Sequence, residues 1–288
     1  MEIYLSPTAG FCDGVKRAYE MIESLDMKTI ATPVRILGNL VHNPDVVKKI
    51  EENGIVKISL EELSKAEKGE IGTLIITAHG IGPDVFEIAR KKKITVIDTT
   101  CPRVIKVQRL AQVFAVRDYE IVLVGDKLHN EVEGIHAWGN RKAQIVSDRS
   151  ELEKLKLAPD KKVAVISQTT QNEEFFREAC AYVGHIHPQV EIFSTICHAT
   201  HDRQTEIKKL AEKFETVIVI GSPMSANSTR LYEISQALNP RTFFVENASE
   251  IKLAELKDAK SIAVMAGAST PSWVIQEVMD LLFSDFKL

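Results

Sequence analysis

Short apolar runs alternate with helical stretches along the whole chain. In the helical stretches, apolar residues recur at the 3.6-residue period, as in Val107, Leu110, Ala111 and Phe114. The runs between them are almost continuously apolar, which is typical of parallel strands covered by helices on both faces. The sequence therefore predicts an α/β protein. The clearest runs are TLIIT (73–77), EIVLV (120–124), KVAVI (162–166), TVIVI (216–220) and SIAVMA (261–266).

Three of the four cysteines follow the same local pattern. Cys12, Cys101 and Cys197 each come at the end of a predicted strand and directly before an amphipathic stretch. A thiol at the N-terminus of a helix meets unpaired N–H groups and the positive end of the helix dipole, which favour thiolate. All three sulfurs are therefore suited to bind metal. The strands that precede them are EIYLS (2–6), ITVIDTT (94–100) and VEIFSTI (190–196).

Two further strands follow each cysteine, and each ends in polar residues. The first delivers a polar side chain 28 to 30 residues after the cysteine, and the second delivers another after 67 to 72 residues. In open parallel sheets, ligands bind outside the carboxyl ends of the strands. The polar residues at these ends are therefore predicted to line a site: His42, His129 and Asn227 from the first set, and His79, Thr169, Thr170 and Ser269 from the second.

The repetition predicts three α/β units, at residues 1–100, 101–196 and 197–288. Each unit would contain a small, mostly parallel sheet flanked by helices. If the three pack around a pseudo-threefold axis, as a trefoil, their strand ends and cysteines face one central cavity. That cavity is the candidate site.

Composition and charge limit the function classes. The net charge is -4 over 288 residues, which indicates no general attraction to nucleic acid or membrane. The N-terminal sequence lacks a signal-peptide pattern, and no apolar run approaches the roughly 20 residues that span a bilayer. A cytoplasmic protein is expected. Four widely spaced cysteines do not resemble a small secreted disulfide scaffold, and a reducing compartment leaves them available as ligands.

Three isolated thiolates favour an iron–sulfur cluster over zinc. Structural zinc sites normally close with a fourth protein ligand and draw two ligands from a C-x2-C knuckle, which this chain lacks. A 4Fe–4S cluster held by three cysteines has one open iron, which can act as a Lewis acid. The fourth cysteine, Cys180 in FFREACAYV, is predicted to be a small buried apolar residue. The alternative is that the three strand-end cysteines are buried structural thiols.

Nine ordered motifs from Cys12 to Ser269 resemble the 4-hydroxy-3-methylbut-2-enyl diphosphate reductase family. The motifs are GFCDGVKRA, LVHNPDVV, TAHGI, DTTCPRV, LHNEVEG, SQTT, TICHATHDRQ, GSPMSANSTRL and AGASTP. The resemblance implies a trefoil of three α/β units around one 4Fe–4S cluster. Cys12, Cys101 and Cys197 would be its ligands, and the fourth iron would bind the substrate.

The same resemblance implies roles for the polar strand ends. Glu131 would be the acid that protonates the departing hydroxyl group, with Thr169 as a relay, and ferredoxin or flavodoxin would supply electrons. Isopentenyl and dimethylallyl diphosphate would be the products. Ala226 stands where a second serine is often found in the family, so only its backbone N–H could reach a phosphate oxygen. The residues that would hold the diphosphate are His42, His79, His129, Ser225, Ala226, Asn227 and Ser269.

Two other functions stay open from the residues alone. A quinolinate-synthase-like dehydratase also uses three units, three cysteines and an open iron, but needs no electron supply. A non-catalytic electron carrier or redox sensor would have no use for an anion pocket, and a sensor would usually bring a nucleic-acid-binding segment. No such segment is recognisable in the sequence.

Overall fold

The computed structural model describes residues 2–286, and they form an α/β protein with three separate four-stranded sheets. Every strand pairing is parallel. The chain divides into two compact units. Unit 1 comprises Met1–Lys16, Val41–Val46 and His198–Leu288, and unit 2 comprises Arg17–Leu40 and Val47–Cys197. The α/β class and the three small parallel sheets that the sequence predicts are confirmed.

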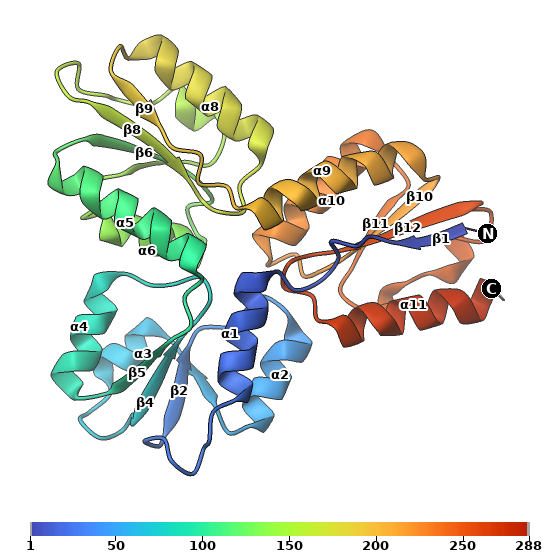
Figure 1. Ribbon diagram of the computed structural model, residues 1–288, viewed down its shortest axis with the longest axis horizontal. Coiled ribbons are helices and arrows are strands. Elements are labelled where there is room, and N and C mark those ends of the chain that lie inside the picture. Colours follow the sequence, from blue (N-terminus) through green and yellow to red (C-terminus); the bar gives the residue numbers. More distant parts are fainter. Residues whose placement is uncertain (1, 287–288) are drawn as a thin grey trace. The chain divides into compact units, whose positions relative to one another are not determined.

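Unit 1 contains one sheet with apolar packing on both faces. Its strands are, in order, β1 (Glu2–Leu5), β12 (Ser261–Ala266), β10 (Thr216–Ile220) and β11 (Thr242–Val245). Figure 1 shows α9 (His198–Lys213) and α10 (Ala226–Leu238) on one face and α11 (Ser272–Phe286) on the other. Successive side chains of β12 point to opposite faces, so Val264 joins the core with α11 while Met265 joins the core with α9. Two short 3-10 helices, Ala248–Glu250 and Leu253–Glu255, lie between β11 and β12.

Unit 2 contains the other two sheets. One has the order β3 (Val56–Ile58), β2 (Val34–Leu37), β4 (Thr73–Ile76) and β5 (Thr95–Asp98). The second has the order β7 (Gln144–Val146), β6 (Glu120–Val124), β8 (Val163–Ser167) and β9 (Val190–Ile192). The helices of unit 2 are α3 (Leu60–Lys65), α4 (Pro83–Lys92), α5 (Pro102–Val116), α6 (Asn130–Trp138), α7 (Arg149–Leu152) and α8 (Glu173–Ile186).

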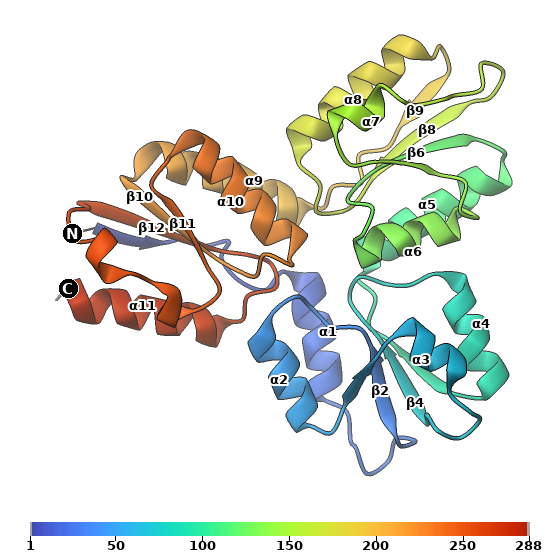
Figure 2. The same cartoon turned by 180° about the vertical axis from the view of Figure 1, so that it is seen from behind.

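The sheet of β6 to β9 shows why its strands read as continuous apolar runs. Ile121 and Leu123 pack with α5 residues such as Val107, while Val122 and Val124 on the opposite face pack with α8. Figure 2 shows these layers from behind, with α5 and α6 on one side of the sheet and α7 and α8 on the other. Both strand faces are thus buried, as expected for parallel sheets.

Two helices each cross from one unit to the other. They are α1 (Asp13–Glu23) and α2 (Pro44–Glu52). Both begin directly after a segment that carries predicted site residues, with Cys12 before α1 and His42 close before α2. Within the described range 2–286, no helix has the length and apolar character needed to cross a membrane.

The three sheets share one strand order. Each has at one edge a strand that leads to one of the three cysteines, next to the strand that leads to the second set of polar residues. These edge strands are β1, β5 and β9, and their neighbours are β12, β4 and β8. The strand before Cys12 therefore pairs with β12 of the C-terminal segment rather than with strands of residues 1–100. β5 and β9 each complete a sheet whose other strands precede them in the chain. β1 instead completes the sheet of β10, β11 and β12, which come from the other end of the chain.

Candidate active site

The three predicted cluster cysteines have the same backbone anchoring. The N–H of Cys101 donates to the carbonyl of Ala78 over 3.0 Å, and the N–H of Cys197 donates to the carbonyl of Thr169 over 3.0 Å. In unit 1 the N–H of Cys12 donates to the carbonyl of Ala268 over 3.3 Å. Each cysteine is thus tied to the end of the neighbouring strand. The same backbone hydrogen bond is thus formed three times, once for each cysteine.

Each of these cysteines also lies at a helix N-terminus. Cys101 is the N-cap residue of α5, with Pro102 in the first turn, and Cys12 and Cys197 directly precede α1 and α9. All three are partly exposed, and none forms a disulfide. Helix N-termini stabilise thiolate, the form that binds metal.

Cys180 is also free of a disulfide, but its position and burial differ from those of the other three cysteines. It lies inside α8 and is buried in the apolar core with Phe176 and Val183. Burial raises the pKa of its thiol to about 11, so it stays protonated near neutral pH. The prediction that Cys180 is a small buried apolar residue is confirmed.

Glu131 and Thr169 meet in a buried contact within unit 2. The backbone N–H of Thr169 donates to Oε1 of Glu131 over 2.6 Å, and the Thr169 hydroxyl donates to Oε2 over 3.0 Å. Glu131 is only 2% exposed, although it lies in the first turn of α6. The structure therefore brings together the two residues predicted as acid and relay.

Burial gives the Glu131 carboxyl the properties of an acid near neutral pH. Its pKa is raised from 4.5 to about 7, chiefly because burial disfavours the charged form. The two hydrogen bonds from Thr169 oppose this rise, and the negative charge of Asp126 adds to it. Near pH 7 the group is therefore present in both protonation states, which suits general acid catalysis.

His129 lies directly before α6 and caps it. Its Nδ1 accepts a hydrogen bond from the backbone N–H of Glu131 over 3.2 Å. In a neutral imidazole whose Nδ1 accepts, the ring proton is on Nε2, so that nitrogen is a donor. The capping role and an anion-binding role are thus compatible. The N-terminal end of α6, with His129 as its cap and Glu131 in its first turn, thus combines a donor with an acid.

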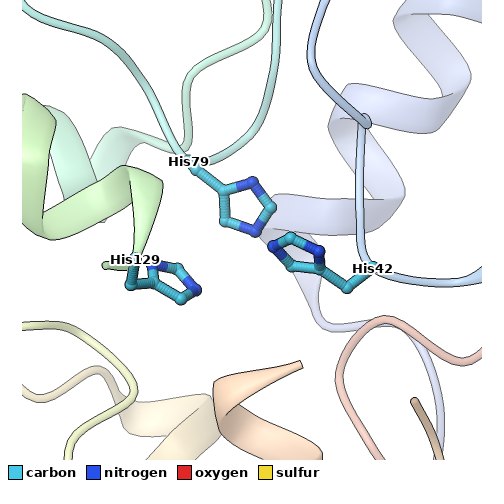
Figure 3. A group of neighbouring side chains, drawn as sticks. All are labelled: His42, His79 and His129. Carbon is cyan, nitrogen blue, oxygen red and sulfur yellow. The ribbon is translucent and has the colours of Figure 1, made fainter. Parts of the chain in front are cut away.

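His79 extends this polar group within unit 2. Its ring meets that of His129 edge to face, with the ring centroids 5.2 Å apart. Figure 3 draws both side chains. His79 follows β4 directly after Ala78, the residue that anchors Cys101. Figure 3 also draws His42, which belongs to unit 1. His42 lies between β2 and α2, where Asn43 caps the helix by accepting from the N–H of Val46.

Unit 1 gathers a second group of predicted residues around Ser225. Ser225 is the N-cap of α10, and the hydroxyl of Ser269 donates to its Oγ over 3.2 Å. Asn227 is 5% exposed, and its Nδ2 has no hydrogen-bond partner among the described residues. A buried amide donor without a partner is costly unless a ligand satisfies it. Ala226 begins α10 between these two residues and offers only its backbone N–H.

Ser228 is a member of this second group that the sequence reasoning missed. It is fully buried, and its hydroxyl donates to Ser225 Oγ over 3.1 Å. A Cβ atom on Gly267 would come within 2.0 Å of Ser228 Oγ, and one on Gly221 within 2.3 Å. The glycines at the ends of β10 and β12 therefore make room for the serine. The sequence signal for Ser228 is the run SANS (225–228) after a strand. The predicted set contains only the first three residues of this run.

The predicted site residues thus form local groups in each unit. Unit 2 carries His79, Cys101, His129, Glu131, Thr169 and Cys197. Unit 1 carries Cys12, His42, Ser225, Ala226, Asn227 and Ser269. The convergence of all three cysteines on one point stays a prediction.

A family model described as LytB protein matches residues 3–283 of this chain. The chain belongs to the LytB protein family. Curated relatives in this family are 4-hydroxy-3-methylbut-2-enyl diphosphate reductases. The chain is 39% identical over 280 residues to the reductase of Citrifermentans bemidjiense, covering 97% of this chain and 96% of that one. It is 38% identical over 282 residues to the reductase of Aquifex aeolicus, covering 96% and 94% of the two chains.

Two solved structures of diphosphate reductases share the fold. One is E-1-hydroxy-2-methyl-but-2-enyl-4-diphosphate reductase from Plasmodium falciparum, with a TM-score of 0.90 and 34% identity, covering 98% of this chain and 88% of that one. The other is (E)-4-hydroxy-3-methyl-but-2-enyl diphosphate reductase, the terminal enzyme of the non-mevalonate pathway. It has a TM-score of 0.69 and 36% identity and covers 99% and 100% of the two chains. The family resemblance that the nine motifs predicted is confirmed.

Proposed function

We propose that the chain catalyses reductive dehydroxylation of 4-hydroxy-3-methylbut-2-enyl diphosphate. The allylic C–O bond breaks, two electrons and two protons are consumed, and water and isopentenyl or dimethylallyl diphosphate form. The observation that carries this proposal is the buried pair of Glu131 and Thr169, in a chain whose named relatives are reductases of this substrate. An acid with a pKa of about 7 can release the hydroxyl group as water.

The three cysteines suit an iron–sulfur cluster. They are free, partly exposed and anchored by the same backbone hydrogen bond, each before a helix whose N-terminus favours thiolate. We infer that Cys12, Cys101 and Cys197 hold one 4Fe–4S cluster with one open iron. When bound, this cluster would supply the electrons one at a time and a Lewis-acidic iron for the substrate oxygen.

Glu131 moves the proton in this scheme. In its protonated form the carboxyl can deliver a proton through the Thr169 hydroxyl, which lies 3.0 Å from Oε2. The backbone N–H of Thr169 holds Oε1 over 2.6 Å, so the carboxyl cannot turn away from the hydroxyl without losing that bond. Once deprotonated, the buried carboxylate is disfavoured by burial, which promotes its reprotonation before the next turnover.

The polar groups at the strand ends would hold the diphosphate. A diphosphate needs several donors from different directions, and imidazole, hydroxyl, amide and helix N-terminal N–H groups supply them without a lysine or arginine cluster. The unpartnered Asn227 Nδ2 and the N-terminus of α10 support this role. We infer that the set comprises His42, His79, His129, Ser225, Ala226, Asn227 and Ser269.

We propose that three units with boundaries near residues 100 and 196 arrange the cysteines around the cluster. The reaction also needs an electron donor, for which we propose ferredoxin or flavodoxin in the cytoplasm. This requirement follows from the reaction, since the substrate gains two electrons in each turnover.

A turnover assay under anaerobic conditions tests this function. The purified protein is supplied with dithionite-reduced viologen and 4-hydroxy-3-methylbut-2-enyl diphosphate, and products are separated by chromatography. We expect isopentenyl and dimethylallyl diphosphate, with about two electrons consumed per product. Consumption of substrate without electron uptake would indicate a dehydratase, and no consumption by cluster-loaded protein would refute the proposed function.

A further inference from the structure

One helix next to a predicted cluster ligand has an unusual surface. α5 starts directly after Cys101 and carries Arg103, Lys106 and Arg109, with no carboxylate anywhere in its 15 residues. Lys106 and Arg109 are exposed, and neither has a carboxylate partner within residues 2–286. The whole chain has a net charge of -4, so this local surplus of positive charge opposes the overall balance.

The same face of α5 also carries exposed apolar side chains beyond its cations. Val113 is 41% exposed and Val116 is 76% exposed. A shallow, open hollow of about 390 Å³ lies among the side chains of this face, and all of its lining residues belong to α5: Pro102, Ile105, Lys106, Arg109, Leu110 and Val113. Single exposed valines are ordinary, but a face that combines several apolar side chains with two cations lacking carboxylate partners among residues 2–286 suits a protein partner.

The position of this surface matters for electron transfer. With a rise of 1.5 Å per residue, Lys106 lies about 8 Å along the helix axis from Cys101, and Arg109 about 12 Å. The N-terminal part of the hollow, at Pro102, is adjacent in sequence to the cysteine itself. A partner seated on this face therefore reaches the immediate neighbourhood of a cluster ligand.

We propose that the exposed face of α5, comprising Pro102, Ile105, Lys106, Arg109, Leu110 and Val113, is the docking surface for an acidic electron-carrier protein. This inference rests on the proposed function, which consumes two electrons and two protons for each C–O bond reduced to C–H and water. The carrier delivers the electrons in two one-electron steps and is itself oxidised. Its acidic residues pair with Lys106 and Arg109, while an apolar patch fills the hollow.

The surface fits a protein better than a nucleic acid. Nucleic-acid binding relies on many phosphate contacts spread along a charged track. α5 offers only three cations, and four of the six residues that line the hollow are apolar. Cations on the rim of a protein interface, by contrast, chiefly accelerate association and select partners of opposite charge.

The test separates donor binding from chemistry by using two reductants. The variant carries Lys106→Glu and Arg109→Glu, and a matched control carries Lys91→Glu and Arg177→Glu, two exposed basic positions on α4 and α8 of the same unit. Both variants undergo the same change in net charge. Turnover of the cluster-loaded protein is measured with reduced flavodoxin and, separately, with reduced viologen.

With flavodoxin at low salt, we expect the α5 variant to lose about 10-fold or more in kcat/KM, mainly through a higher KM for flavodoxin. The loss should shrink as salt is raised, because screening weakens charge steering. Viologen-driven turnover should stay within about twofold of the parent, and the control variant should resemble the parent with both reductants.

Other outcomes overturn the inference in distinguishable ways. Equal flavodoxin kinetics in the α5 variant and the parent would refute docking at α5 while leaving the proposed function intact. A parent without viologen-driven turnover would refute the proposed function itself. Strong competition by a short DNA duplex against flavodoxin, or a dimer that the α5 substitutions dissociate, would assign the surface to a different occupant.

Discussion

Replacing Glu131 by glutamine should abolish most activity and at the same time stabilise the fold at alkaline pH. Both effects come from the same buried carboxyl. In the folded parent its pKa is about 7, against 4.5 for an ordinary glutamate. Folding therefore favours the protonated form, and the associated stabilisation is fully present below about pH 4.5. It is lost as the pH rises through about 7.

The size of the effect follows from this difference in pKa. At about 1.4 kcal/mol per pKa unit, the parent loses about 2 to 3 kcal/mol of stability from this group between about pH 5 and about pH 8. Glutamine does not titrate, so Glu131→Gln should gain that amount relative to the parent over the same range. Its amide oxygen can still accept from the Thr169 N–H, which keeps the local geometry.

Urea unfolding of parent and variant at the two pH values measures this effect. Trp138 lies in α6 with Glu131 and donates through its indole N–H to the carbonyl of Ile81 over 2.9 Å, so its fluorescence reports on unit 2. A Trp273→Phe background removes the other tryptophan. The matched control is Glu133→Gln, since Glu133 is about half exposed and pairs with Arg141 at the surface.

The activity of Glu131→Gln should fall by about 10²- to 10⁴-fold in kcat, the range typical for loss of a general acid. Cluster content and substrate KM should change little. The parent kcat should decline as the pH rises through about 7, where the acid form is depleted. Near-normal turnover in Glu131→Gln, or a stability difference that is the same at both pH values, would refute this account of the carboxyl.

Three further predictions concern other groups. Thr169→Val removes the hydroxyl that donates to Glu131 Oε2, and so it should raise the pKa of Glu131. The pH–rate profile should therefore move to higher pH, and an unshifted profile would contradict this. Asn227→Leu removes a buried amide donor that has no partner among the described residues. It should raise the substrate KM about 10-fold or more without lowering the urea midpoint. A destabilised variant with an unchanged KM would show that the amide stabilises the fold rather than binds the substrate. Cys180→Ser should keep the full iron content but lose about 1 to 3 kcal/mol of stability, whereas Cys101→Ser should lose iron; iron loss in Cys180→Ser would mean that this thiol is a ligand.

The interior strands could be predicted from the sequence because strands buried on both faces consist almost entirely of apolar residues. Residues of β4, β6, β8, β10 and β12 are buried on both faces, so each strand reads as an apolar run. The fourth strand of each sheet, by contrast, went unpredicted. β3, β7 and β11 have three or four residues and lie at sheet edges, where alternation and burial are weak.

No feature of the sequence around residues 2–5 predicts that β1 pairs with β12. The strand contains four residues, and its partner lies more than 250 residues away in sequence. Parallel pairing is fixed by the path of the chain between the strands rather than by the strand's own residues. The predicted strand 190–196 was also too long, because β9 ends at Ile192. Beyond it, Thr195 turns its hydroxyl toward the backbone of Ser167.

For the site, the sequence indicated residue types, and the fold supplied the contacts. Glu131 and Thr169 were named from separate motifs 38 residues apart, and only the pairing of β6 with β8 brings their strand ends together. The burial that raises the pKa of Glu131 could not be read from a helix position that looks exposed in sequence. Ser228 was missed for the same reason, since its importance depends on the two glycines that close around it.

The central claim is that three cysteines hold one cluster whose open iron meets the substrate. Mössbauer spectroscopy of the anaerobically purified, iron-57-labelled protein tests it most directly, recorded with and without 4-hydroxy-3-methylbut-2-enyl diphosphate. We expect about four iron ions per chain, with one of them distinct and shifted on addition of substrate. Four equivalent irons that do not respond to substrate, or a mononuclear site, would contradict the account.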